Sequence, residues 1–563
     1  MQIPQLTPPA AVRHTLDTFA GYHHAPRIGD NEFAFEENLT ADHHPVLAPR
    51  RGRRLQTAAR AGALLEKDSL CWTDGPNFVV SGYPVDLGLT PGDKQLVSMG
   101  AYVVIFPDKK YINTLDLTEF GSLEAYFSTD EAVAITPCDQ AGNPLTPTAG
   151  EEAPDPAASP LWLDTAQAVP VLRRYDSLNQ VWIDEQTPYL RLDAPGIGRD
   201  FRELDGVQID GLPEDYWNGS RVIWRRGEDY LVLYGLTGAP ASAPGITLSR
   251  CLPEMDFVIS AGNRLWGCRY GLEDGQPVNR IYASKLGDFR NWQCYLGIST
   301  DSFALALGDD GPFTGGICFR GQPLFFRENC LHRIYGATPD TFRLQTTDCP
   351  GVERGSHRSL ALVGQSLYYK SAAGICVYDG SLPAPASRAL GQQVFKNACA
   401  GAYGEKYFVS MEDEAGSKHL FVLDTARKLW HRESDPGFTA FCPCRDTLFA
   451  ASAEGIWDLF GDEETVSWVA QTGKWDIGTP EMLYTTRLTA NFSLEAGATL
   501  SIYARSDGGP WQLLMRRTAH RDQSYSVPIR PRRCRTLELR LEGTGQARVF
   551  SLSRTVEKGS ELP

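Results

Sequence analysis

Short apolar segments separated by polar turns recur along the middle of the chain. Four of these turns begin at Gly321, Gly364, Gly404 and Cys444, so successive turns lie 43, 40 and 40 residues apart. Most repeats contain a second hairpin, which makes about four strands in each repeat. Repeats of this length and strand number are typical of β-propeller blades. The pattern therefore predicts a β-propeller.

Weaker copies of the repeat begin at Gly100, Gly227 and Gly262. They extend the predicted propeller over residues 61–465, with five blades or as many as eight. The segment around 120–220 breaks the period, and its Pro-, Gly- and Ala-rich part at 140–159 is typical of an exposed loop. We interpret it as a loop-rich insertion or an irregular blade, and favour the insertion.

Beyond residue 466 the pattern changes to strand-length alternation of apolar and polar residues, as in 483–494 and 499–504. Ser506-Asp-Gly-Gly is a hairpin turn between two such segments. Residues 466–563 are therefore expected to form a C-terminal β-sandwich.

The N-terminal 60 residues carry six prolines and show no sustained period. Their apolar density is too low for a core of their own, which favours an extended arm over residues 1–60. The fold class expected for the whole chain is all-β. We also expect that deletion of residues 1–54 leaves the propeller folded but prevents assembly.

Composition and charge narrow the function classes. The chain of 563 residues has a net charge of −15 and a pI near 5.2, which argues against general nucleic-acid binding. Its 13 cysteines are scattered and odd in number, which favours a reducing compartment over a disulfide framework. The N-terminus has no apolar signal region, and no apolar run reaches the length of a membrane span. We expect folding in a cytoplasm.

The segment 38–54, NLTADHHPVLAPRRGRR, is the most unusual stretch of the sequence. His43 and His44 beside Asp42 suggest a metal site. In an extended segment, however, adjacent side chains point to opposite faces, so the two imidazoles cannot easily bind one ion. We therefore favour solvated or contact-forming histidines.

Arg50, Arg51, Arg53 and Arg54 form a dense basic run in this segment. Three interpretations stay open: contact with carboxylates of a neighbouring subunit, a solvated arm, or phosphate contacts. We favour the subunit contact, with His43 and His44 as part of it.

The sequence lacks the common catalytic and cofactor-binding motifs, among them the P-loop, the GxSxG elbow and HExxH. Ser506-Asp-Gly-Gly-Pro-Trp resembles the Asp box of sialidase-type propellers, but it occurs once and a hairpin turn explains it. No pair of carboxylates stands out for glycosidase chemistry. The sequence therefore predicts no catalytic residues, no metal, no cofactor and no enzymatic activity.

Several passages together resemble a family of tailed-phage virion proteins from phages and prophages of gut Firmicutes. They include Ile28-Gly-Asp-Asn-Glu-Phe33, Lys94–Lys110, Ile281–Trp292 and Pro531-Arg-Arg-Cys534. More distantly, the chain is similar to the propeller-bearing tail-tube, nozzle or stabilisation proteins of short-tailed phages.

This resemblance implies a structural tail or neck protein that assembles as a homo-oligomeric ring, is made in the host cytoplasm and is located in the virion. Its partners would be other tail, neck or portal proteins, with passing contact to genomic DNA and no membrane span. The alternative is a receptor- or glycan-binding, even glycan-cleaving, propeller. A cleft with exposed aromatic rings beside paired carboxylates would favour that alternative.

Overall fold

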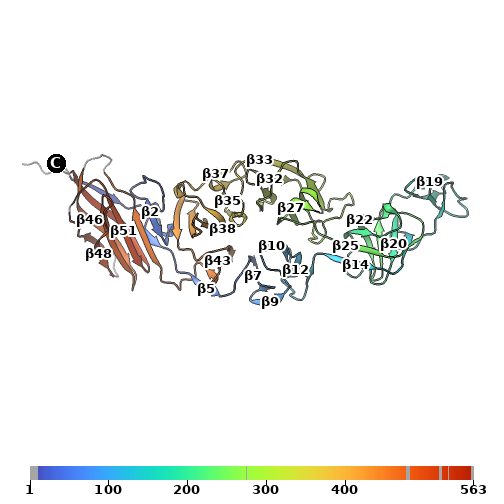
Figure 1. Ribbon diagram of the computed structural model, residues 1–563, viewed down its shortest axis with the longest axis horizontal. Coiled ribbons are helices and arrows are strands. Elements are labelled where there is room, and N and C mark those ends of the chain that lie inside the picture. Colours follow the sequence, from blue (N-terminus) through green and yellow to red (C-terminus); the bar gives the residue numbers. More distant parts are fainter. Residues whose placement is uncertain (1–10, 274, 477–481, 519–522, 531, 559–563) are drawn as a thin grey trace, which may run out of the picture. The chain divides into compact units, whose positions relative to one another are not determined.

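The computed structural model describes residues 11–273, 275–476, 482–518, 523–530 and 532–558 (Figure 1). Strands make up 52% of the chain and helix 2%, which confirms the all-β prediction. The chain divides into two compact units: unit 1 comprises Met1–Pro84, Phe326–Cys330 and Asp348–Pro563, and unit 2 comprises Val85–Phe325 and Leu331–Thr347. No helix in the described ranges is long and apolar enough to cross a membrane.

Within the described residues and outside the segment 125–250, seven four-stranded sheets have strands that pair in the order of the chain, apart from one strand of the last sheet. The first four are β6 to β9 (Leu64–Lys67, Ser69–Asp74, Asn77–Val80, Tyr83–Asp86), β10 to β13 (Gln95–Met99, Tyr102–Phe106, Lys110–Asn113, Phe120–Ser122), β26 to β29 (Phe257–Ala261, Arg264–Glu273, Gln276–Ala283, Phe303–Ala306) and β30 to β33 (Gly315–Phe319, Gln322–Phe326, Cys330–Tyr335, Arg343–Asp348). The other three are β34 to β37 (Ala361–Val363, Ser366–Ser371, Gly374–Tyr378, Ala384–Pro385), β38 to β41 (Lys396–Tyr403, Lys406–Glu412, Lys418–Asp424, Leu429–Glu433) and β42 to β44 (Ala440–Cys444, Thr447–Ser452, Gly455–Asp458) with β5 (Arg54–Thr57).

The four turns that revealed the repeat each join the first two strands of a sheet. Gly364 and Gly404 adopt φ of +59° and +58°, a left-handed conformation that glycine tolerates best. In the last sheet Arg445 occupies this position with φ +53°. Within each unit, neighbouring sheets pack through their first strands: β34 lies beside β38, β38 beside β42 and β42 beside β6 in unit 1, and β10 beside β26 and β26 beside β30 in unit 2.

The insertion is larger than expected and forms its own sheets within unit 2. An eight-stranded sheet runs in the order β14-β25-β21-β22-β23-β20-β15-β24, and a small sheet holds β16 to β19. Their strands are β14 (Ala125–Thr129), β15 (Val133–Cys138), β16 (Thr148–Gly150), β17 (Leu161–Asp164), β18 (Val171–Asp176), β19 (Val181–Asp184), β20 (Tyr189–Asp193), β21 (Gly206–Asp210), β22 (Gly219–Arg226), β23 (Tyr230–Tyr234), β24 (Ala241–Ala243) and β25 (Ile246–Arg250).

The assignment of Gly227 to the 40-residue repeat is therefore wrong. Gly227 lies in the turn between β22 and β23, and β23 pairs with β20, a strand about 40 residues earlier in the chain. A hairpin of this kind has the local pattern of a repeat, but its pairing partners place it in the insertion.

Two five-stranded sheets in unit 1 share one hydrophobic core at the C-terminal end of the chain. One contains β1, β52, β46, β49 and β50, and the other β2, β45, β51, β47 and β48. Their strands are β1 (Ala11–Leu16), β2 (Phe33–Glu37), β45 (Ser467–Thr472), β46 (Leu483–Leu494), β47 (Thr499–Ser506), β48 (Gln512–Arg517), β49 (Gln523–Val527), β50 (Arg533–Cys534), β51 (Leu537–Thr544) and β52 (Ala547–Lys558).

The expectation of an extended N-terminal arm without a core differs from the structure. Residues 1–10 of that segment lie outside the described residues. From Ala11 onward, β1 pairs with β52, β2 pairs with β45, and β5 pairs with β44. Phe19, Phe33 and Leu47 are buried in the core shared by the two five-stranded sheets. The segment lacks a core of its own because it contributes to cores built by residues far away in the sequence.

Candidate functional site

Two arginines of the basic run are buried within unit 1. The side chains of Arg50 and Arg53 are 5% and 4% exposed. Arg53 Nη2 lies 2.8 Å from Glu433 Oε2, and its Nη1 donates to the carbonyl of Ser434. Arg50 donates to Glu464 and, through Nε, to the side chain of Asn38. Both guanidinium groups thus have carboxylate partners in their own chain.

The other four candidate residues lie closer to solvent. Arg54 is half-buried and pairs with Asp458 at 3.0 Å. His44 Nδ1 donates a hydrogen bond to the carbonyl of Phe19 at 3.2 Å. Arg51 and His43 are exposed and line a cleft. The structure therefore separates the six residues instead of joining them in one surface, and their role in subunit contact stays a prediction.

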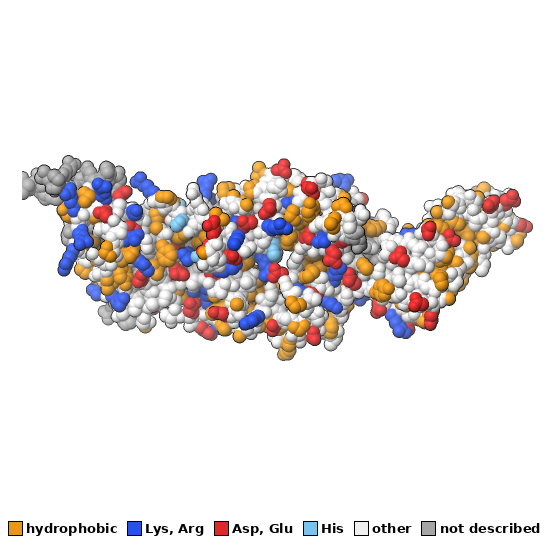
Figure 2. Space-filling view, in the orientation of Figure 1, with side chains coloured by type: hydrophobic (Ala, Val, Ile, Leu, Met, Phe, Trp, Pro, Cys, Tyr) orange, Lys and Arg blue, Asp and Glu red, His pale blue; other side chains and the backbone are white. Residues whose placement is uncertain are grey.

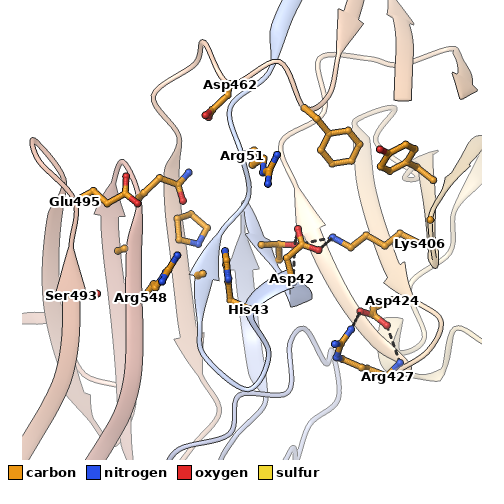
Figure 3. Close-up of a pocket in the computed structure, with 18 of the residues that line it drawn as sticks. Asp42, His43, Arg51, Lys406, Asp424, Arg427, Asp462, Ser493, Glu495 and Arg548 are labelled. Carbon is orange, nitrogen blue, oxygen red and sulfur yellow. Dashed lines mark hydrogen bonds and ion pairs between the residues drawn. The ribbon is translucent and has the colours of Figure 1, made fainter. Parts of the chain in front are cut away.

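This cleft lies within unit 1 and has a volume of about 1330 Å³ (Figure 3). Its walls come from three regions: the segment around β3 (Leu39–Thr40), the 3₁₀ turn η1 (Ala41–His43) and β4 (Ala48–Pro49); the sheets of β38 to β44; and the ends of β46 and β52. The residues that line it are Thr40, Asp42, His43, Ala48, Pro49, Arg51, Tyr403, Gly404, Glu405, Lys406, Asp424, Arg427, Asp446, Phe460, Asp462, Ser493, Leu494, Glu495, Ala496, Gln546, Ala547 and Arg548.

Two ion pairs organise one side of the cleft. Lys406 Nζ lies 2.6 Å from Asp42 Oδ1, and Arg427 Nη1 lies 2.8 Å from Asp424 Oδ2. Thr40 joins the first pair, since Lys406 Nζ donates to its hydroxyl and that hydroxyl donates to Asp42. Burial opposes ionisation of Asp42, but the charge and hydrogen bond of Lys406 outweigh it and hold the pKa of Asp42 below its ordinary value. Asp42 is therefore an anion at neutral pH.

Two aromatic rings form an apolar wall beside these charges. The rings of Tyr403 and Phe460 are both half-buried, and their centroids lie 4.9 Å apart at an interplanar angle of 36°. The Tyr403 hydroxyl donates to the carbonyl of Asp446, which fixes the orientation of the ring. The wall therefore presents apolar surface in a fixed position.

The remaining charged groups of the cleft reach toward solvent. Arg51, Arg548, Glu405 and Glu495 are exposed, and within the described part of the chain their side chains form no hydrogen bond or ion pair. Figure 3 shows Arg51 and Arg548 on segments from opposite ends of the sequence. Such a mixture of donors, acceptors and apolar rings suits a ligand that carries both hydroxyl groups and apolar faces.

The sequence singled out three lining residues, Asp42, His43 and Arg51, and missed the others. The turn at Gly404 was recognised for its repeat, but its neighbours Tyr403 and Lys406 carried no separate signal. Residues 40–51, 403–462 and 493–548 meet only because β2 and β5 pair with C-terminal strands. Pairing over such separations leaves no local pattern.

The sequence matches no protein-family model and no curated protein. Among solved structures, it is similar to an exo-β-1,3-galactanase from Phanerochaete chrysosporium, with 9% identity over 53% of this chain and 94% of that chain and a TM-score of 0.22. A sialidase from Trypanosoma rangeli matches at 8% identity over 91% of this chain and 96% of that chain, with a TM-score of 0.19. A further match, described as a glycoside hydrolase, has 13% identity, covers 64% of this chain and 94% of that chain, and has a TM-score of 0.19.

These matches correct the sequence-based prediction that the chain is not an enzyme. The similar structures are glycoside hydrolases and a sialidase, so enzymatic activity is no longer excluded. TM-scores near 0.2 carry no argument for a particular fold or reaction. The case for any function therefore depends on the geometry of the chain itself.

Proposed function

We propose that the protein binds a saccharide in the cleft of unit 1. The observation that carries this proposal is the aromatic wall of Tyr403 and Phe460 beside the Asp42–Lys406 and Asp424–Arg427 ion pairs. Aromatic faces pack against the C–H faces of sugar rings, and charged groups bind the sugar hydroxyls. The cleft differs from the site expected for the glycan-binding alternative, because its rings are half-buried and its carboxylates are paired with cations instead of with each other.

The architecture that we propose for the chain is a β-propeller with a C-terminal β-sandwich. It is supported by the seven four-stranded sheets, by the adjacency of their first strands within each unit, and by the shared core of the two five-stranded sheets. A propeller supplies short loops at the end of each blade, which can form the walls of a cleft. The structural virion role implied by the resemblance to phage proteins stays a prediction that no comparison supports.

Binding can be measured by a glycan array followed by isothermal titration with the best oligosaccharide. We expect Tyr403→Ala to weaken binding about tenfold, because the loss of one aromatic stacking contact costs roughly 1–1.5 kcal/mol. Tyr403→Phe keeps the ring but loses the hydrogen bond to Asp446, so it should bind more tightly than Tyr403→Ala. Incubation with the same oligosaccharide, followed by chromatography, reports whether the protein also hydrolyses it.

A matched control is Tyr126→Ala, which removes an exposed tyrosine from the insertion. It should leave binding unchanged. The proposal is wrong if no oligosaccharide binds, or if Tyr403→Ala, shown to be folded by circular dichroism, binds as tightly as the wild type.

A further inference from the structure

The C-terminal sheets are basic in a chain that is otherwise acidic. Residues 482–558 contain 13 Lys and Arg and 6 Asp and Glu, a net charge of +7, which leaves −22 for the remainder of a chain of net charge −15. Figure 2 shows Lys and Arg side chains gathered over the region where Figure 1 labels β46 and β48. An asymmetry of this size indicates a local surface for an anionic partner.

The strand β46 connects the cleft to this basic surface. Its residues alternate: Leu488, Ala490, Phe492 and Leu494 are buried in the core, so the residues between them face solvent. We call the solvent-facing residues Tyr484, Arg487, Thr489, Asn491 and Ser493 the β46 face.

One end of the β46 face reaches the cleft. Ser493 lines the cleft, and its partner across the sheet is Arg548, which also lines the cleft. Because directly opposed residues point to the same side of a sheet, the Arg548 side chain lies on the side of the β46 face.

The other end of the β46 face lies beside the dense arginine run. Tyr484 is opposite Arg533 of β50, and the exposed residues Arg530, Arg532 and Arg535 flank that strand. In the described ranges, the side chains of these three flanking arginines have neither a hydrogen bond nor an ion pair. Tyr484 and Ser493 are separated by about 30 Å at roughly 3.3 Å per residue of strand.

We infer that the saccharide of the proposed function is an acidic polysaccharide that lies along the β46 face. One end would enter the cleft beside Arg548 and Arg51, and acidic groups farther along the polymer would pair with Arg487 and the arginine run. Thr489, Asn491 and Ser493 supply hydrogen-bond partners for its hydroxyl groups. A span of about 30 Å excludes a single sugar as the ligand of both ends. This inference depends on the proposed function, because it specifies the ligand of the same cleft.

The experiment compares polymers that differ only in charge: polygalacturonate with its methyl ester, and dextran sulfate with dextran. Binding to the full chain is measured by isothermal titration at low salt and at 0.5 M salt. We expect at least one charged polymer to bind about tenfold more tightly than its neutral counterpart, and salt to remove most of this difference. The two pairs distinguish carboxylate from sulfate as the preferred group.

The variant Arg530→Gln/Arg532→Gln/Arg535→Gln should lose this charge preference but keep binding of a short neutral oligosaccharide in the cleft. A matched control, Arg174→Gln/Arg199→Gln/Arg225→Gln, removes three exposed arginines from the insertion and should have no effect.

Equal binding of charged and neutral polymers would overturn the inference and leave the proposed function intact. The same conclusion follows if the arginine variant binds like the wild type. If the wild-type chain binds neither neutral nor charged saccharides, the proposed function itself is overturned. A duplex DNA of similar charge serves as a competitor of the bound polysaccharide. If it displaces the polysaccharide as well as free polysaccharide does, the surface binds polyanions in general and the assignment to a polysaccharide is refuted.

Discussion

At the scale of single residues, the basic run of the N-terminal segment is divided between buried and exposed positions. Arg50 and Arg53 are buried with Glu433, and Arg53 also lies over the ring of Phe438 at 5.3 Å from its centroid. Burial of charge is costly unless each group is paired and hydrogen-bonded. These arginines therefore fasten the N-terminal segment to β41.

Replacement of Arg53 tests this role. Arg53→Met should lower the free energy of unfolding by about 3 kcal/mol, because it removes a partner from the buried carboxylate of Glu433. Arg51→Ala, an exposed neighbour, should change it by less than about 0.5 kcal/mol. Urea unfolding followed by tryptophan fluorescence measures both, and equal stability of the two variants would contradict a structural role for Arg53.

The Asp42–Lys406 pair makes a prediction about pH. The folded-state pKa of Asp42 lies below its ordinary value of 3.8, so the pair stabilises the fold above pH 3.8 and loses its effect as the pH falls through the lower, folded-state pKa. Because Asp42 is half exposed, Asp42→Asn should reduce stability at pH 7 by only about 0.5–1 kcal/mol.

The difference between wild type and Asp42→Asn should be constant from pH 8 to 5 and should disappear at the acid end of the curve. Thermal unfolding from pH 8 down to pH values below 3.8 measures it. A difference that grows as the pH falls would contradict the assigned direction of the pKa shift.

At the scale of elements, the N-terminal strands complete sheets that begin hundreds of residues later. β5 supplies the fourth strand beside β44, and β1 and β2 each extend a C-terminal five-stranded sheet. An edge strand left without its partner exposes a row of backbone donors and acceptors. The N-terminal strands therefore complete the sheets of unit 1 and cover edge strands that would otherwise be unpaired.

Deletion of residues 1–57 tests this closure. The expectation from sequence was that the propeller would survive a similar deletion, but the structure reverses it. We expect the truncated chain to aggregate or to unfold well below the wild-type melting temperature, because β44 loses its partner and the core loses Phe19, Phe33 and Leu47. A truncated chain that melts like the wild type would refute this role.

Strands and turns could be predicted from the sequence where the residues that determine them are close together in the chain. The hairpin turns at Gly321, Gly364 and Gly404 were identified correctly because a turn and its two strands are adjacent in sequence. The short strands β1 to β5 were not identified, since their prolines and weak alternation resemble an arm. Their strand conformation depends on partners such as β45 and β52.

At the scale of the whole molecule, the insertion has its own hydrophobic core. This core includes Val133, Leu192, Ile209, Trp217 and Leu248, each at most 1% exposed. β14 is the first strand of the insertion and β25 is its last. The two strands pair with each other, and Ala125 lies opposite Arg250. Adjacent ends and a separate core are the features of a segment that can fold alone.

We therefore expect a fragment of residues 124–251 to fold cooperatively. A domain of this size buries enough apolar surface for independent stability. Circular dichroism and dispersion of its amide NMR signals measure folding, and Trp217→Ala should abolish the cooperative transition because it leaves a large cavity in the core. A fragment without a cooperative transition would contradict the independence of this core.

The sequence by itself determined the all-β class, the 40-residue repeat and the strand alternation near the C-terminus. Each of these depends on neighbours within a few residues, so periodicity and turn chemistry are sufficient to reveal them. The tertiary structure decided the closure of unit 1 by N-terminal strands, the extent of the insertion, and the cleft that joins Asp42, Tyr403 and Arg548. Those features depend on pairing between strands that are distant in the sequence. The driving force for this pairing is shared burial and hydrogen bonding. The residues of one strand do not by themselves indicate which distant strand it pairs with.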